Sequence, residues 1–135
     1  MKPLRNKHTT RGLSLIEITL VIGLMLALAS IITYSVSAMT DWQKGRDASE
    51  KLKAVYIAQK SYMADHPSKV ASSFTSSELI PYLPNRPGAM PSANSLEDQS
   101  LELNFAVMPP QFFLGGAKYD PSDSPTDSLW DVGSL

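Results

Sequence analysis

Glu17 is the residue that most needs a chemical explanation, because it is a carboxylate inside a long apolar run. Residues 13–39 contain no other charged side chain. A charge in such surroundings costs on the order of 2.5–3.5 kcal/mol at the centre of a bilayer, and less near the interface. Glu17 is therefore unexplained by an ordinary membrane-spanning helix unless its carboxylate reaches back to the membrane surface.

A second group of carboxylates lies near the C-terminal end of the sequence. It consists of Asp120, Asp123, Asp127 and Asp131. Calcium prefers carboxylate and carbonyl oxygens, so this group is a candidate calcium site. The spacing fits no EF-hand loop, however, and Asp-Pro and Ser-Pro pairs are ordinary turn formers. The pattern favours solvated turn residues, with calcium as the alternative.

Catalytic residue patterns are not found in this sequence. The chain contains no cysteine, which excludes a disulfide, a thiolate zinc site and a cysteine nucleophile. His8 lies in the basic N-terminal stretch, and His66 lies at an expected helix end. No nucleophile elbow, glycine-rich phosphate loop or HExxH motif is present. We expect neither an enzyme nor a cofactor.

Charge is distributed unevenly along the chain. Four basic residues and no acidic residue precede Gly12, whereas the remainder has eight Lys and Arg against thirteen Asp and Glu. A nucleic-acid-binding domain would carry its basic residues on the folded part, so no nucleic-acid partner is expected. Basic residues on one side of an apolar segment place that side in the cytoplasm.

The apolar segment is long enough to cross a membrane, because a helix needs about 20 residues to span the hydrocarbon core. An ordinary secretory signal would be cut after Val36-Ser37-Ala38. Its apolar region would then be about twice the usual 7–15 residues and would contain a glutamate. A plain single-pass anchor fits the length, with Glu17 reaching back to the cytoplasmic surface.

A third interpretation accounts for both a glycine and the glutamate. The stretch Gly12-Leu13-Ser14-Leu15-Ile16-Glu17 follows a short basic leader. It resembles the class III signal of type IV pilins and type II secretion pseudopilins. That signal has a leader ending in glycine and a glutamate at the fifth mature position. The resemblance implies cleavage between Gly12 and Leu13. The family most often has Phe at this position, so N-methylation of Leu13 is less certain than cleavage.

The resemblance also implies a function and partners. A prepilin peptidase would create a new amine at Leu13, and Glu17 would pair with the amine of a neighbouring subunit. The precursor would lie in the bacterial inner membrane with its N-terminus in the cytoplasm. An inner-membrane assembly platform would then build it into a periplasmic or extracellular filament of pilin or pseudopilin subunits. The alternative is a monomeric, membrane-anchored or secreted ligand-binding module.

The expected fold is α+β, with one long helix packed on a small antiparallel sheet. Residues 1–12 form the leader, 13–40 the membrane and assembly half of the helix, 41–66 its amphipathic half, and 67–135 a small globular domain. Gly45 is a possible flexible point or kink, and Pro67 should end the helix at His66. One face of residues 47–66 is expected to be core, with these members: Ala48, Leu52, Val55, Tyr56, Gln59, Tyr62 and Met63.

The remainder of the chain predicts short elements joined by loops. Residues 68–77 read as loop, with Thr75 and Glu78 in the pattern of a capping box before a short helix. Residues 84–95 are rich in proline and predict an exposed loop. Residues 101–107 alternate between apolar and mostly polar side chains, which predicts a strand. Gly115-Gly116 predicts a turn. Residues 117–135 predict paired segments that bury Tyr119, Trp130 and Val132.

Overall fold

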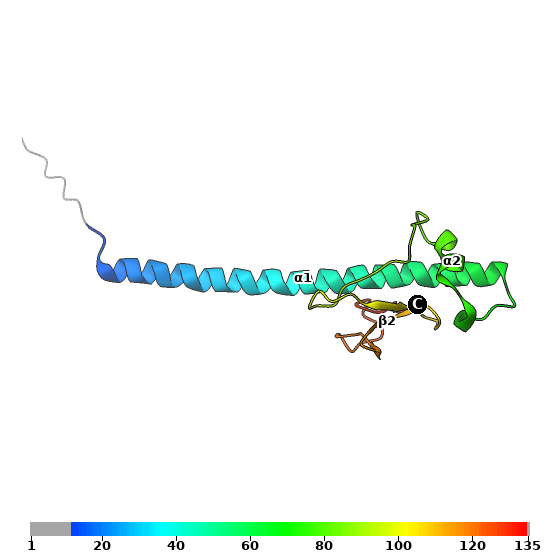
Figure 1. Cartoon of the computed structure of the whole chain (residues 1–135). Helices are drawn as coiled ribbons and strands as arrows, with labels where there is room; N and C mark the ends of the chain where they lie inside the picture. Colours follow the sequence, from blue (N-terminus) through cyan, green and yellow to red (C-terminus); the bar gives the residue numbers. More distant parts are fainter. Residues whose placement is uncertain (1–11, 135) are drawn as a thin grey trace, which may run out of the picture. The chain divides into compact units, whose positions relative to one another are not determined.

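The computed structural model describes residues 12–134, so the predicted leader lies outside the described residues except for Gly12. One long helix is followed by a small region of short elements (Figure 1). The helix is α1, Leu15–Asp65. The later elements are η1 (Ala71–Ser73), α2 (Ser76–Leu79), η2 (Ile80–Tyr82), β1 (Glu102–Asn104), β2 (Gln111–Leu114) and β3 (Ala117–Lys118). The long helix and three-stranded antiparallel sheet confirm the α+β class.

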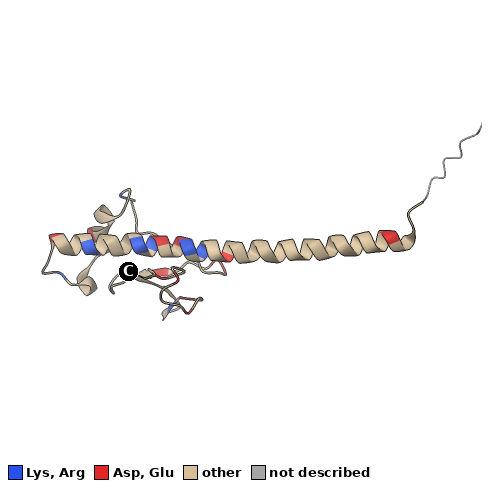
Figure 2. Cartoon of the chain, turned by 180° about the vertical axis from the view of Figure 1, so that it is seen from behind, with Lys and Arg blue, Asp and Glu red and all other residues tan. Residues whose placement is uncertain are grey.

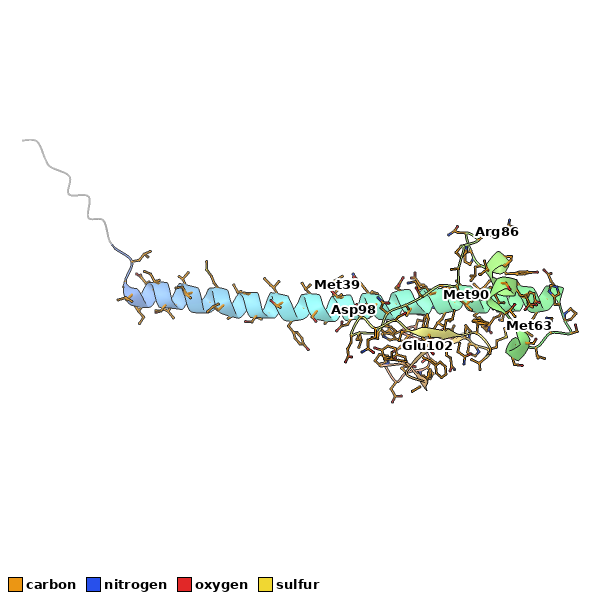
Figure 3. All side chains as sticks on the ribbon, in the orientation of Figure 1. Met39, Met63, Arg86, Met90, Asp98 and Glu102 are labelled. Atoms are coloured by element: carbon orange, nitrogen blue, oxygen red, sulfur yellow. The ribbon has the colours of Figure 1, made fainter. Side chains whose placement is uncertain are left out.

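Helix α1 has two halves of different character, because the chain divides after Ser37 into two compact units. We call residues 15–37 the apolar half and residues 38–65 the packed half. Within α1, Lys and Arg residues occur only in the packed half, whereas Glu17 is the single charged residue of the apolar half. Figure 2 colours these positions on the ribbon. Side chains of the apolar half stand away from the helix on all sides (Figure 3). Every residue from 12 to 37 is exposed.

The packed half carries the core-forming face that the sequence predicts. Its most buried large residues include Leu52, Val55, Gln59 and Tyr62, which recur at helical spacing. Tyr56 and Met63 are partly buried at the edges of the same face. The helix ends at Asp65, directly before His66 and Pro67, as predicted. Gly45, Ser49 and Ala58 are buried as well, and the sequence pattern did not identify them.

The three strands form one antiparallel sheet in the order β1-β2-β3. Leu103 of β1 pairs with Phe112 of β2, and Leu114 of β2 pairs with Ala117 of β3. Gly115 and Gly116 form the turn between β2 and β3 with φ values of 60° and 84°. Glycine adopts such positive φ angles without a steric penalty, so the predicted turn is confirmed. The sequence did not predict β2 itself.

Strand β1 is shorter than the alternating pattern of residues 101–107 predicts. The Oδ1 atom of Asn104 accepts the N–H of Ala106 at 3.0 Å, which bends the chain at the end of β1. Beyond it, the Nε2 atom of Gln59 donates to the carbonyls of Phe105 and Val107 at 2.8 and 3.0 Å. A helix side chain therefore takes the hydrogen bonds that a longer strand would have used.

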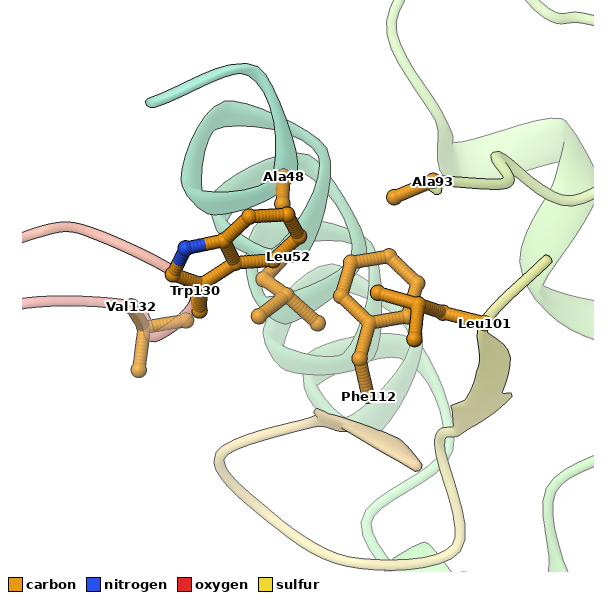
Figure 4. Close-up of a cluster of buried hydrophobic side chains, with 7 residues drawn as sticks. All are labelled: Ala48, Leu52, Ala93, Leu101, Phe112, Trp130 and Val132. Atoms are coloured by element: carbon orange, nitrogen blue, oxygen red, sulfur yellow. The ribbon is translucent and has the colours of Figure 1, made fainter. Parts of the chain in front are cut away.

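The main core cluster joins the packed half to the sheet and to the C-terminal segment (Figure 4). Leu52 and Phe112 are fully buried in this cluster, and Trp130 of the C-terminal segment packs in it with them. The expected burial of Trp130 and Val132 is confirmed, with Tyr119 partly buried against them. Ala93 joins the same cluster, so the predicted exposed loop over residues 84–95 is wrong at its C-terminal end.

Segment 119–134 contains no strand, so the predicted pairing of C-terminal segments is wrong beyond β3. Its backbone instead meets helix α1 at Gly45, whose carbonyl accepts the N–H of Trp130 at 3.1 Å. A Cβ atom on Gly45 would lie 2.8 Å from Nε1 of Trp130. The helix continues through Gly45 without a break. The expected flexible point is thus a close contact, and the glycine is required because a larger residue would displace the indole.

Candidate functional site

Glu17 belongs to a capping box at the start of α1. Its Oε2 atom accepts the backbone N–H of Ser14 at 2.8 Å, and its own N–H donates to Oγ of Ser14 at 3.3 Å. The carbonyl of Ser14 accepts the N–H of Ile18 at 3.2 Å, which makes Ser14 the N-cap residue. These bonds satisfy N–H groups that a helix start otherwise leaves unpaired. The helix accordingly begins at Leu15, two residues after the predicted cut.

The sequence contained the signal for this arrangement, because Ser14 and Glu17 have the Ser-x-x-Glu spacing of a capping box. Sequence reasoning treated Glu17 only as a membrane charge and missed it. Gly12 and Leu13 precede the cap, and both are exposed. The three residues expected to act in processing and assembly therefore lie within one turn of the helix start. Glu17 receives no other hydrogen bond within residues 12–134.

The apolar half has the properties of a membrane-spanning helix. Among the described residues, α1 is the one helix long and apolar enough to cross a membrane. Three of its hydroxyl side chains donate to carbonyls of the helix itself: Thr19 to Ile16 at 2.9 Å, Ser30 to Leu26 at 2.8 Å and Thr33 to Ala29 at 2.9 Å. Such internal bonds remove the cost of placing hydroxyl groups in lipid.

A second capping box lies in the domain, where Thr75 caps α2 and Glu78 is its N3 residue. This confirms the predicted cap. Unlike Glu17, Glu78 receives further donors: Tyr62 Oη at 2.7 Å and Lys69 Nζ at 3.0 Å, both on Oε1. The hydroxyl of Tyr62, then Lys69 and the Thr75 backbone, lower the pKa of Glu78 to about 2. This network ties the end of α1 to the segment that follows it.

Three of the four C-terminal aspartates have separate local roles. Asp120 binds Lys118 Nζ at 2.8 Å and accepts the hydroxyl of Ser122 at 2.8 Å, while Asp127 accepts the N–H of Leu129 at 2.9 Å. Asp131 is buried and accepts the N–H of Gly133. Burial raises the pKa of Asp131. Within residues 12–134 no three or more His, Cys, Asp or Glu side chains are grouped to hold a metal ion.

The alternative ligand-binding function would need a site in the domain. One groove of about 300 Å³ lies between the packed half and residues 92–98. Lys44 and Lys51 line it, but Lys44 is paired with Asp98 at 2.7 Å and Lys51 with Asp47 at 2.6 Å. The charged groups of this groove are thus neutralised by each other, and no feature of it favours a particular ligand.

Comparison of the chain with protein families, with curated proteins and with solved structures found no match in any of the three.

Proposed function

We propose that this chain is a structural subunit of a type IV pilus-like filament or a type II secretion pseudopilus. The supporting observation is the exposed apolar half of α1, which begins at Leu15. It has the capping residue Glu17 in its first turn and contains no other charge. The packed half of the same helix already has its core partners. A helix half without such partners is suited to lipid before assembly and to other subunits afterwards.

In this proposal the chain is inserted with its N-terminus in the cytoplasm, and prepilin peptidase hydrolyses the Gly12–Leu13 bond. The new ammonium group at Leu13 is costly in an apolar environment unless a carboxylate accompanies it. Glu17 uses Oε2 to hold the Ser14 N–H, which leaves Oε1 for the ammonium of a neighbouring subunit. The assembly platform then transfers the apolar helix from lipid into a bundle of like helices, where packing supplies the affinity.

The first test is the N-terminal residue of the mature protein from its host. Leu13 is expected for the pilin-like subunit, Met39 for a signal peptide and Met1 for an uncleaved anchor. Gly12→Val should block cleavage, whereas Gly23→Val is the matched control, since a Cβ atom there meets nothing within 4 Å. A mature chain that begins at Met39 would refute the proposal.

A second test separates the assembly role of Glu17 from its capping role. Glu17→Gln keeps an oxygen that can accept the Ser14 N–H, because Gln also serves at this position of a capping box, but it removes the charge. Ser14→Ala removes the hydroxyl of the cap and keeps the charge. We expect Glu17→Gln to be inserted and cleaved but left out of filaments, and Ser14→Ala to be incorporated. Normal incorporation of Glu17→Gln would assign Glu17 to capping alone.

A further inference from the structure

The packed half of α1 has a row of cations beside its core-forming face. Arg46, Lys53 and Lys60 follow one another at seven-residue intervals, which keeps them within about 20° per step on one face. The exposed side chains of Trp42 and Ile57, 54% and 58% accessible, lie among them. We call these five residues the outer face. The Lys and Arg positions along the packed half can be followed in Figure 2.

The five cations of the packed half divide into two kinds. Lys44 and Lys51 are neutralised within the chain by Asp98 and Asp47, at 2.7 and 2.6 Å.

The cations of the outer face are less closely paired. Arg46 forms an ion pair with Glu50 on the same helix at the long distance of 3.9 Å. Lys53 donates to the hydroxyl of Ser128 at 3.1 Å, and Lys60 lies 4.5 Å from the ring centre of Tyr56. Within residues 12–134 no carboxylate forms an ion pair with either lysine. The outer face therefore carries two lysines without an ion pair and one weakly paired arginine beside exposed apolar side chains.

The C-terminal part of the chain has the opposite excess. Residues 93–135 contain seven acidic side chains and one basic side chain. Asp98 and Asp120 are paired with lysines, and Asp131 is buried. Glu97, Glu102 and Asp123 are exposed and form no ion pair within the part of the chain that the structure describes. One molecule thus carries cations on its helix and exposed, unpaired carboxylates in its C-terminal part; we call Glu97, Glu102 and Asp123 the acidic C-terminal surface.

We propose that the outer face binds the acidic C-terminal surface of a second copy of the chain. Trp and Arg are enriched at protein interfaces, and complementary charges steer association and fix register. The two surfaces are different, so the contact is heterologous and can repeat from copy to copy in an open array. This inference rests on the proposed function, because it supplies a contact between the domains of neighbouring subunits.

An anionic membrane surface is the competing partner for a basic helix face. It would bind the outer face, but it would leave the unneutralised carboxylates of the same domain without a role. A second copy uses both surfaces, which is why the charge distribution favours it.

The test reverses charge on the full chain in its host. Arg46→Glu/Lys60→Glu changes two outer-face cations and leaves Lys53, whose bond to Ser128 belongs to the fold. We expect the assembled fraction to fall on the order of tenfold, because two attractive contacts are lost and the reversed charges repel the carboxylates of the neighbouring copy. Adding Glu97→Lys/Glu102→Lys/Asp123→Lys to the same chain should restore assembly. Arg86→Glu is the matched control, because Arg86 is exposed and lies outside the outer face.

A second measurement follows the contact without filaments. The chain has no cysteine, so Ile57→Cys and Asp123→Cys chains expressed together can form a disulfide only between copies. A cross-linked heterodimer in membranes supports the contact even if the proposed function fails. If assembly depends on Glu17 but is unchanged by charge reversal, and no cross-link forms, this inference alone is overturned. Loss of binding of the Arg46→Glu/Lys60→Glu chain to vesicles containing anionic lipid, with normal assembly and no cross-link between the Ile57→Cys and Asp123→Cys chains, would overturn it in favour of a membrane surface.

Discussion

The two halves of α1 belong to one continuous helix but are stabilised in different ways. The apolar half contains no buried residue, whereas the packed half contains eight, including Leu52, Val55 and Tyr62. The apolar half contains many β-branched residues and the packed half more Ala and Lys, yet both are helical, so local propensity does not explain how they differ in stabilisation. The difference lies in what surrounds each half: the chain buries one face of the packed half, whereas every residue of the apolar half is exposed in the part of the chain that the structure describes.

The glutamates at the N3 positions of α1 and α2 differ in the same way, in the partners that the chain supplies to them. Glu17 and Glu78 each complete a capping box, and each accepts a backbone N–H at the N-cap. Glu78 then receives Tyr62 and Lys69 from its own domain, whereas Glu17 receives no further donor within the described residues. The same capping motif therefore receives further donors from the chain at Glu78, and receives none among the described residues at Glu17.

The largest expected effect compares two leucines of the same helix. Leu52→Ala removes a fully buried side chain from the main cluster and should destabilise the domain by about 2–5 kcal/mol. Leu24→Ala makes the same chemical change where the side chain is 63% exposed, and it should leave domain unfolding unchanged. Urea denaturation in detergent, followed by Trp130 fluorescence in a Trp42→Phe background, measures both. Equal losses would show that the apolar half also packs on the domain.

A smaller effect is expected from two glycines. Gly45→Ala places a Cβ atom 2.8 Å from Trp130 Nε1 and 3.3 Å from Leu129 Cδ2. Overpacking costs about 1–3 kcal/mol, and the gain in helix propensity offsets about 1 kcal/mol of it. We expect a net loss of about 1 kcal/mol in the same denaturation assay. Gly23→Ala gains helix propensity without a new contact, so it should not destabilise the domain. If Gly45→Ala instead stabilises the domain, the indole of Trp130 moves aside without cost.

The smallest effect compares the two capping glutamates through their dependence on pH. The folded-state pKa of Glu78 is about 2, below the ordinary value of 4.5. Its carboxylate therefore contributes stability above pH 4.5, and this contribution is lost as the pH falls toward 2. Glu78→Gln should lower the melting temperature at neutral pH and flatten its decline in this acid range. Glu17→Gln is the control and should leave the domain's melting temperature unchanged; identical acid profiles for Glu78→Gln and wild type would contradict the assignment.

Several elements could be predicted from local pattern alone. Periodicity predicted the buried face of α1, Pro67 predicted its end, and Thr75 with Glu78 predicted the cap of α2. Each of these depends on residues within a few positions of one another, where spacing and backbone sterics are sufficient. The charge-free run and its single glutamate were also visible, because composition is a property of the sequence and needs no fold.

Other features depend on residues far apart in the sequence. Strand β2 was missed because Phe112 and Phe113 are recognisable as strand residues only beside β1. The length of β1 is set by Gln59, more than 40 residues earlier. Pairing of the C-terminal segments was wrong because Trp130 donates its N–H to Gly45 of the helix instead of to a neighbouring strand.

The sequence by itself thus determined a capped helix with an apolar first half, a single carboxylate at its start and an amphipathic continuation. These follow from periodicity, hydrophobicity and local hydrogen-bonding patterns. Only the tertiary structure decided that Gly45 is a contact point for an indole and that Glu78 is held by Tyr62 and Lys69. It also decided that Lys44 is neutralised by Asp98, 54 residues further along the chain, while Lys60 on the outer face meets no carboxylate among the described residues. Charge pairing and close packing depend on which distant segments meet, and that is fixed only when the core forms.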